Sequence, residues 1–128
     1  MKKLTISFFI IITLCVSAFS QSTLSEPAQE ATVPYRLFKT TNRWTYIELD
    51  TVTGRMWQIQ YDTQGDSRGG VVLNDQNLAK DKEIIVGRFT LYPTENMWTF
   101  ILLDQIEGSS WQVQWSFEKE DRFVIPIY

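Results

Sequence analysis

The sequence contains one motif twice, 54 residues apart. The stretch DTVTGRMWQIQY begins at Asp50, and DQIEGSSWQVQW begins at Asp104. When residues 35–61 are aligned with residues 89–115 without a gap, 12 of the 27 positions are identical. Six further pairs exchange one aromatic or β-branched residue for another. An internal duplication explains this agreement, and it predicts that the chain folds as two similar units.

Each repeat has the pattern of four short β-strands. From residue 33 onward, runs rich in Val, Ile, Thr, Tyr, Phe and Trp are broken by Gly, Asn, Asp and Pro, which is typical of an all-β domain. We predict two tandem four-stranded antiparallel repeats, with repeat 1 at 33–74, a linker at 75–86 and repeat 2 at 87–128. The expected strands are 34–39, 44–50, 56–61 and 70–73 in repeat 1, and 87–92, 97–104, 111–117 and 122–127 in repeat 2.

Side chains alternate between the two faces of a strand. In the third strand of each repeat, one side is apolar and the other carries amides, so we expect a core side and a wet side. The apolar sets are Trp57, Ile59 and Tyr61, and Trp111, Val113 and Trp115; the amides are Gln58 and Gln60, and Gln112 and Gln114. The second strand of each repeat is apolar on both sides at one end. It is therefore either covered on both sides or presents an aromatic patch.

The loop between the second and third strands accounts for part of the repetition. Asp50 and Asp104 can accept hydrogen bonds from backbone N–H groups two or three residues further on, and Gly54 and Gly108 supply the positive φ that other residues resist. We interpret these residues as turn formers rather than as catalytic or metal-binding groups.

The residues LDTVTGRMWQI resemble the blade signature of WD-type and quinoprotein-type β-propeller repeats, in which an Asp, a Thr-Gly turn and a strand tryptophan recur. The resemblance covers about a dozen residues per copy. Quinoprotein repeats usually place the tryptophan four residues after the glycine, whereas Trp57 and Trp111 follow Gly54 and Gly108 by three. One residue of slippage turns a side chain to the opposite face. The docking role of that tryptophan is therefore not carried over, and no quinone cofactor is implied.

Two blades are fewer than the four to eight of a propeller, and open blades leave sheet edges free to pair with another chain. Two arrangements solve this problem. Either the two four-stranded units close on each other as a small β-sandwich or barrel, or several subunits complete an oligomeric propeller. We favour the first, because about 95 residues suffice for a small sandwich.

The N-terminus has the pattern of a secretory signal peptide. Lys2 and Lys3 precede an apolar run at 4–16, which a small-x-small cleavage pattern follows at 18–20. We expect residues 1–20 to be a signal peptide too short to span a membrane, residues 21–32 to be a flexible tether, and the protein to be periplasmic, cell-surface or extracellular. Cys15 offers an alternative as a lipid attachment site. Cleavage after residue 20 would leave no cysteine.

Charge and composition exclude several kinds of function. Without residues 1–20 the chain has ten basic and fifteen acidic groups, a net charge of −5, which argues against nucleic acid as a partner. The sequence has no histidine, the commonest general base and metal ligand. The acids mostly stand beside turn residues. We therefore expect a protein that is not an enzyme and needs no metal or cofactor.

The abundance of tryptophan, tyrosine and amide side chains favours a binding function. Sugar rings stack on exposed aromatic faces while amides satisfy their hydroxyl groups. The candidate platforms for carbohydrate are Trp44, Tyr46, Trp98 and Phe100, and the candidate polar contacts are Asn42, Asn96, Gln58 and Gln112. The alternative is a protein-interaction or envelope-accessory module that uses the same aromatic surface for a protein partner. Any one of these aromatic residues is more often found in the core, and nothing in the sequence decides the ligand or the oligomeric state.

Overall fold

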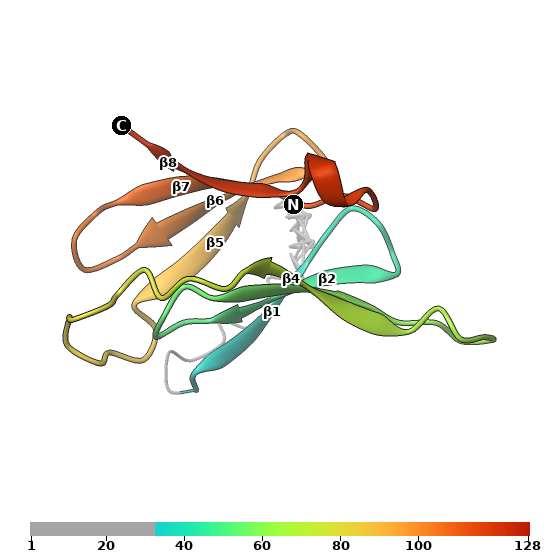
Figure 1. The fold of residues 1–128 in the computed structure, drawn as a ribbon, viewed down its shortest axis with the longest axis horizontal. Helices are drawn as coiled ribbons and strands as arrows, with labels where there is room; N and C mark the ends of the chain where they lie inside the picture. Colours follow the sequence, from blue (N-terminus) through green and yellow to red (C-terminus); the bar gives the residue numbers. More distant parts are fainter. Residues whose placement is uncertain (1–32) are drawn as a thin grey trace, which may run out of the picture.

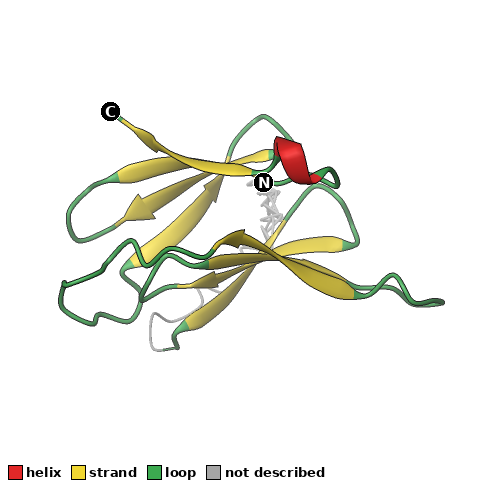
Figure 2. Cartoon of the chain, in the orientation of Figure 1, coloured by secondary structure: helices red, strands yellow, loops and turns green. Residues whose placement is uncertain are grey.

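The computed structural model describes residues 33–128, and in this range the chain forms two four-stranded β-sheets (Figure 1, Figure 2). The strands are β1 (Tyr35–Lys39), β2 (Thr45–Asp50), β3 (Met56–Gln60), β4 (Gly69–Asn74), β5 (Phe89–Pro93), β6 (Thr99–Asp104), β7 (Ser110–Gln114) and β8 (Phe123–Ile127), with a short 3-10 helix, η1 (Lys119–Asp121), before β8. The predicted all-β fold of two four-stranded units is confirmed. The predicted signal peptide, the tether and Cys15 lie outside the described residues.

Each sheet is an antiparallel meander, in which neighbours along the chain are neighbours in the sheet. The pairing of strands repeats at a spacing of 54 residues: Thr45 pairs with Gln60 in the first sheet, and Thr99 pairs with Gln114 in the second. A β-bulge at Met56 distinguishes the first sheet from the second. The duplication is therefore present in the backbone pairing as well as in the side chains.

The turns between β2 and β3 and between β6 and β7 form as the sequence predicts. One carboxylate oxygen of each aspartate accepts hydrogen bonds from the backbone N–H groups two and three residues further on, at 2.9 and 3.4 Å for Asp50 and at 2.9 and 3.2 Å for Asp104. Gly54 and Gly108 have φ angles of +77° and +79°. These turns fix the length and register of the hairpins that they close.

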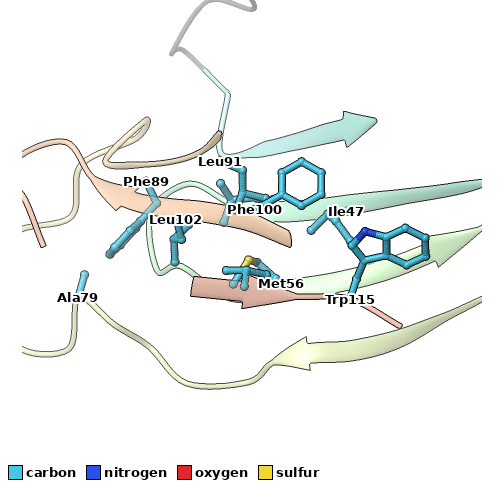
Figure 3. Close-up of a cluster of buried hydrophobic side chains, with 10 residues drawn as sticks. Ile47, Met56, Ala79, Phe89, Leu91, Phe100, Leu102 and Trp115 are labelled. Atoms are coloured by element: carbon cyan, nitrogen blue, oxygen red, sulfur yellow. The ribbon is translucent and has the colours of Figure 1, made fainter. Parts of the chain in front are cut away.

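The two sheets pack face to face, with β2 close to β5 and β4 close to β8. In Figure 1 the second sheet (orange to red) lies above the first (cyan to green), and the yellow segment at 75–88 joins them on the left. Between them lies one cluster of buried apolar side chains, most of which Figure 3 labels. Its members are Ile47, Leu49, Met56, Ala79, Phe89, Leu91, Phe100, Leu102, Val113 and Trp115. This cluster replaces the disulfides that a small exported domain often uses.

The two sheets bury opposite faces. We call face A the face that carries Ile47 and Leu49 in the first sheet and their counterparts Ile101 and Leu103 in the second. We call face B the other face, which carries Tyr46, Trp57, Ile59 and Tyr61 in the first sheet and Phe100, Trp111, Val113 and Trp115 in the second. Face A of the first sheet packs against face B of the second, because the two sheets stack in the same orientation.

The prediction of a core side and a wet side in the third strand of each repeat is therefore right for one repeat and wrong for the other. In the second repeat, Val113 and Trp115 are buried as expected. In the first repeat, Met56 and Gln58 are the buried residues and Tyr61 is exposed. Alternation along a strand separates its two faces, but it does not say which face meets the other sheet.

Candidate functional site

The two predicted asparagines shape turns. The side-chain oxygen of Asn42 accepts a hydrogen bond from the backbone N–H of Trp44 at 2.8 Å, and that of Asn96 accepts the equivalent bond from Trp98 at 2.9 Å. Asn42 also accepts a hydrogen bond from the hydroxyl of Thr45. These asparagines position the first residue of each tryptophan-bearing strand, and their oxygens are already engaged in doing so.

The four predicted aromatic platforms separate into an outer pair and an inner pair. Trp44 and Tyr46 belong to a half-buried cluster on the outer side of the first sheet, where their ring centroids lie 5.2 and 6.2 Å from that of Tyr61. Their counterparts lie on the inner side of the second sheet. Trp98 packs on Trp115 at 4.6 Å between centroids, and Phe100, only 3% exposed, offers no face to solvent.

A cleft opens between the two sheets, at the end where the β3–β4 hairpin meets the loop after β7. Its volume is about 290 Å³, close to the lower limit of small-ligand sites. Most of its lining is polar or backbone, and it comprises Gln58, Gln60, Asp66, Ser67, Arg68, Gly69, Gly70, Val71, Phe117 and Arg122. Both repeats contribute to it, so the cleft depends on the way the sheets stack.

Gln58 is the predicted residue that lies in this cleft. Its side chain is 5% exposed, and its Oε1 atom is buried with no hydrogen-bond partner among residues 33–128. An unpaired buried oxygen costs about 1–3 kcal/mol, so native structures rarely keep one without a reason. Gln112, the counterpart of Gln58, pairs with Ile125 on the outer face of the second sheet and lies away from the cleft.

Phe117 and Arg122 are held in place on the cleft wall from the second repeat. Two nitrogens of Arg122 donate to the backbone oxygens of Ser116 and Phe117, each at 2.7 Å. The ring of Phe117 stands edge-on to Trp98 and Trp115, with centroids 5.9 and 5.7 Å away. The cleft therefore has one fixed aromatic ring beside fixed polar groups.

Sequence reasoning did not single out Phe117, Arg68 or Arg122 as site residues. Phe117 lies beyond the aligned block of the repeats, so no pattern marks it. Arg68 and Arg122 are 54 residues apart and hence equivalent. This spacing was a usable signal, because two arginines at the same position of a duplicated unit line the same cleft.

A second polar cluster, also missed, lies at the turn of the second repeat. Arg88 donates to Asp104 Oδ2 at 3.1 and 2.7 Å, and both side chains are almost fully buried. Glu107 also contacts Arg88, and it pairs with Lys82. Burial raises the pKa of Asp104, but the hydrogen bonds from Arg88 and from two backbone N–H groups outweigh it, so this pKa lies below its ordinary value. The cluster holds the turn in place and presents no free carboxylate.

Two searches of residues 33–128 give negative results. No group of three or more Asp, Glu, Cys or His side chains in this range is arranged to hold a metal ion. No helix in the same range is long and apolar enough to cross a membrane. Comparison of the chain with protein-family models, with curated proteins and with solved structures finds no match.

Proposed function

We propose that this chain is an exported, non-catalytic binding protein and that its ligand is a carbohydrate held in the cleft between the two sheets. Export rests on the signal-peptide pattern of residues 1–20. The observation that carries the ligand proposal is the unpaired Oε1 atom of Gln58, which is buried at the cleft.

A sugar hydroxyl has the chemistry that this oxygen lacks. A hydroxyl can donate to Gln58 Oε1 and, at the same time, accept from a guanidinium group such as that of Arg68. A hydrogen bond made inside a partly buried cleft is stronger than one made in water. The ring of Phe117 offers an apolar surface for the C–H side of a pyranose. Mixed amide, guanidinium and aromatic linings of this kind suit a neutral, hydroxyl-rich ligand.

The aromatic residues predicted from sequence have different roles in this proposal. Trp98 supports the ring of Phe117 from below, and thus acts on the cleft indirectly. Trp44 and Tyr46 stand on the opposite side of the molecule's first sheet, where their cluster with Tyr61 suits the alternative function, binding to a protein.

The proposal is tested by titrating the purified protein with a panel of glycans while tryptophan emission is recorded, because Trp98 and Trp115 touch Phe117. A saturable change that is weakened at least ten-fold in both Gln58→Met and Arg68→Met is the expected result. Gln76→Met, on the exposed segment that joins the sheets, is a matched control and should bind like the wild type.

Two outcomes would contradict the proposal. One is the absence of binding to every glycan of a broad panel. The other is a saturable signal that survives in Gln58→Met and Arg68→Met, since the ligand would then occupy another surface. Either result would favour the protein-interaction alternative, in which the outer aromatic cluster contacts a protein partner.

A further inference from the structure

We propose that copies of this chain assemble head to tail, with face A of the second sheet of one copy packed on face B of the first sheet of the next, and that this assembly closes into a ring. This inference concerns the outer faces of the two sheets and does not depend on the carbohydrate proposal.

The first reason is the equivalence of the faces. The interface inside the chain joins face A of the first sheet to face B of the second. The faces left on the outside are face B of the first sheet and face A of the second. They carry, position for position, the counterparts of the residues that already pack together, because strand pairing repeats with a spacing of 54. The chain thus presents both halves of its own internal interface, unpaired, at opposite ends.

The second reason is the apolar character of these outer faces. An antiparallel sheet with one solvated face normally has polar residues there. Here both outer faces carry large apolar side chains that are 37–57% exposed. On the outer face A they are Tyr92, Ile101, Ile125 and Ile127; on the outer face B they are Tyr35, Leu37, Tyr61 and Val72. Adjoining exposed side chains of this kind mark an interaction surface.

The third reason is a backbone hydrogen bond between the repeats. The N–H of Phe89, at the start of β5, donates to the carbonyl of Thr51 in the first repeat at 2.8 Å. The counterparts of these two residues are Tyr35 and Gln105, which belong to the first and second repeats respectively. A second copy stacked in the same orientation would bring the N–H of Tyr35 to the carbonyl of Gln105 of its neighbour.

An interface between two different surfaces gives a ring when the rotation closes and an open filament when it does not. Four-stranded meanders stacked in one orientation close as propellers of about four to eight sheets. Because each copy supplies two sheets, the expected ring contains two to four copies. Closure also removes the unpaired outer faces, which is why a ring is favoured over a filament.

Sedimentation velocity on the purified protein, over a dilution series, measures the assembly. We expect the wild type to sediment as two to four chains, and Ile101→Arg (outer face A) and Val72→Arg (outer face B) to sediment as single chains. Ile84→Arg is the matched control: Ile84 is 83% exposed, but it lies in the segment between the sheets and on neither face. This control should assemble like the wild type. Thermal unfolding of each variant shows whether its fold is retained.

Mixing the two face variants tests the head-to-tail geometry. Ile101→Arg keeps an intact outer face B and Val72→Arg keeps an intact outer face A, so an equimolar mixture should form two-chain complexes that neither variant forms alone. A wild type that remains a single chain up to its solubility limit would overturn the proposal. So would a dimer that only one of the two variants disrupts, because it would pair identical faces.

Discussion

Ile47 and Ile101 are the same residue at the same position of the two repeats, yet Ile47 is completely buried and Ile101 is 37% exposed. Their strands, turns and pairing partners are equivalent. The difference arises only from the stacking of the sheets, which places face A of the first sheet inside and face A of the second outside.

This pair gives the first prediction. Ile47→Ala should lower the free energy of unfolding by about 2–5 kcal/mol, because it leaves a cavity in a packed core. Ile101→Ala should lower it by less than about 1 kcal/mol when the chain is dilute enough to sediment as one copy. Urea denaturation measures both values. Equal losses would show that the two sheets do not stack in the same orientation.

The second prediction concerns the unpaired oxygen of Gln58. Gln58→Met keeps most of the side-chain volume and removes the buried acceptor, so it should raise the free energy of unfolding by about 1 kcal/mol. The same change should weaken glycan binding. Calorimetric unfolding and the glycan titration are made on the same preparation. A variant that is less stable than the wild type would indicate that Gln58 is already satisfied in the free protein.

The third prediction concerns acid stability. The pKa of Asp104 is lower in the folded chain than in the unfolded chain, where it is about 3.9. Ionised Asp104 therefore stabilises the fold at higher pH, and this contribution is lost as the pH falls through the folded pKa. Asp104→Asn should reduce the free energy of unfolding by about 3 kcal/mol near pH 7, since it breaks a buried ion pair.

The pH series supplies the check on this prediction. Below about pH 4 the difference between the wild type and Asp104→Asn should shrink, because the wild type loses the same charge. Asp50→Asn alters the equivalent turn, where hydrogen bonds from the turn itself occupy the carboxylate. It should cost less at pH 7 than Asp104→Asn does. A difference that stays constant down to pH 2 would contradict the assigned role of the charge.

The fourth prediction separates two effects at the turn glycines. Ala at Gly108 should destabilise the protein by about 1 kcal/mol, because a positive φ strains an L-residue and nothing lies within 4 Å of the added carbon. Ala at Gly54 should cost more, because its Cβ would stand 2.9 Å from Leu78. Thermal melts of the two single variants compare these costs, and an equal loss would mean that Leu78 moves away freely.

The fifth prediction tests the outer face B by strengthening it. Glu48 occupies the position that Leu102 holds in the internal interface. Glu48→Leu should lower the concentration of half-assembly about ten-fold, since a buried leucine contributes about 1.5–3 kcal/mol. Glu83→Leu, on the exposed segment between the sheets, controls for general hydrophobicity. An equal gain in both variants would point to non-specific association.

The strands were predictable because their signals are local. Runs of β-formers and the Asp and Gly residues at each turn define the hairpins, and Asp50 and Gly54 make the contacts expected of them. The inward face was not predictable, because it depends on contacts between strands far apart in sequence. Gln58 illustrates this limit: its polar side chain indicates solvent, but the stacking of the sheets buries it.

The cleft was only partly predictable for the same reason. Gln58 was among the residues expected to contact a ligand, whereas Phe117 and Arg122 were not. They reach the cleft through a loop and a 3-10 helix whose sequences have no counterpart in the aligned part of repeat 1. A site built where two repeats meet leaves no compact motif in either repeat.

The stacking of two equivalent sheets in one orientation makes the order of the repeats along the chain a structural determinant in its own right. Each repeat has both faces, so the peptide connection decides which face A meets which face B. A chain in which the second repeat preceded the first would pack Ile101 against Tyr61 and leave Ile47 and Trp115 at its surface. Connectivity, as much as side-chain chemistry, selects the tryptophans that form this protein's interior.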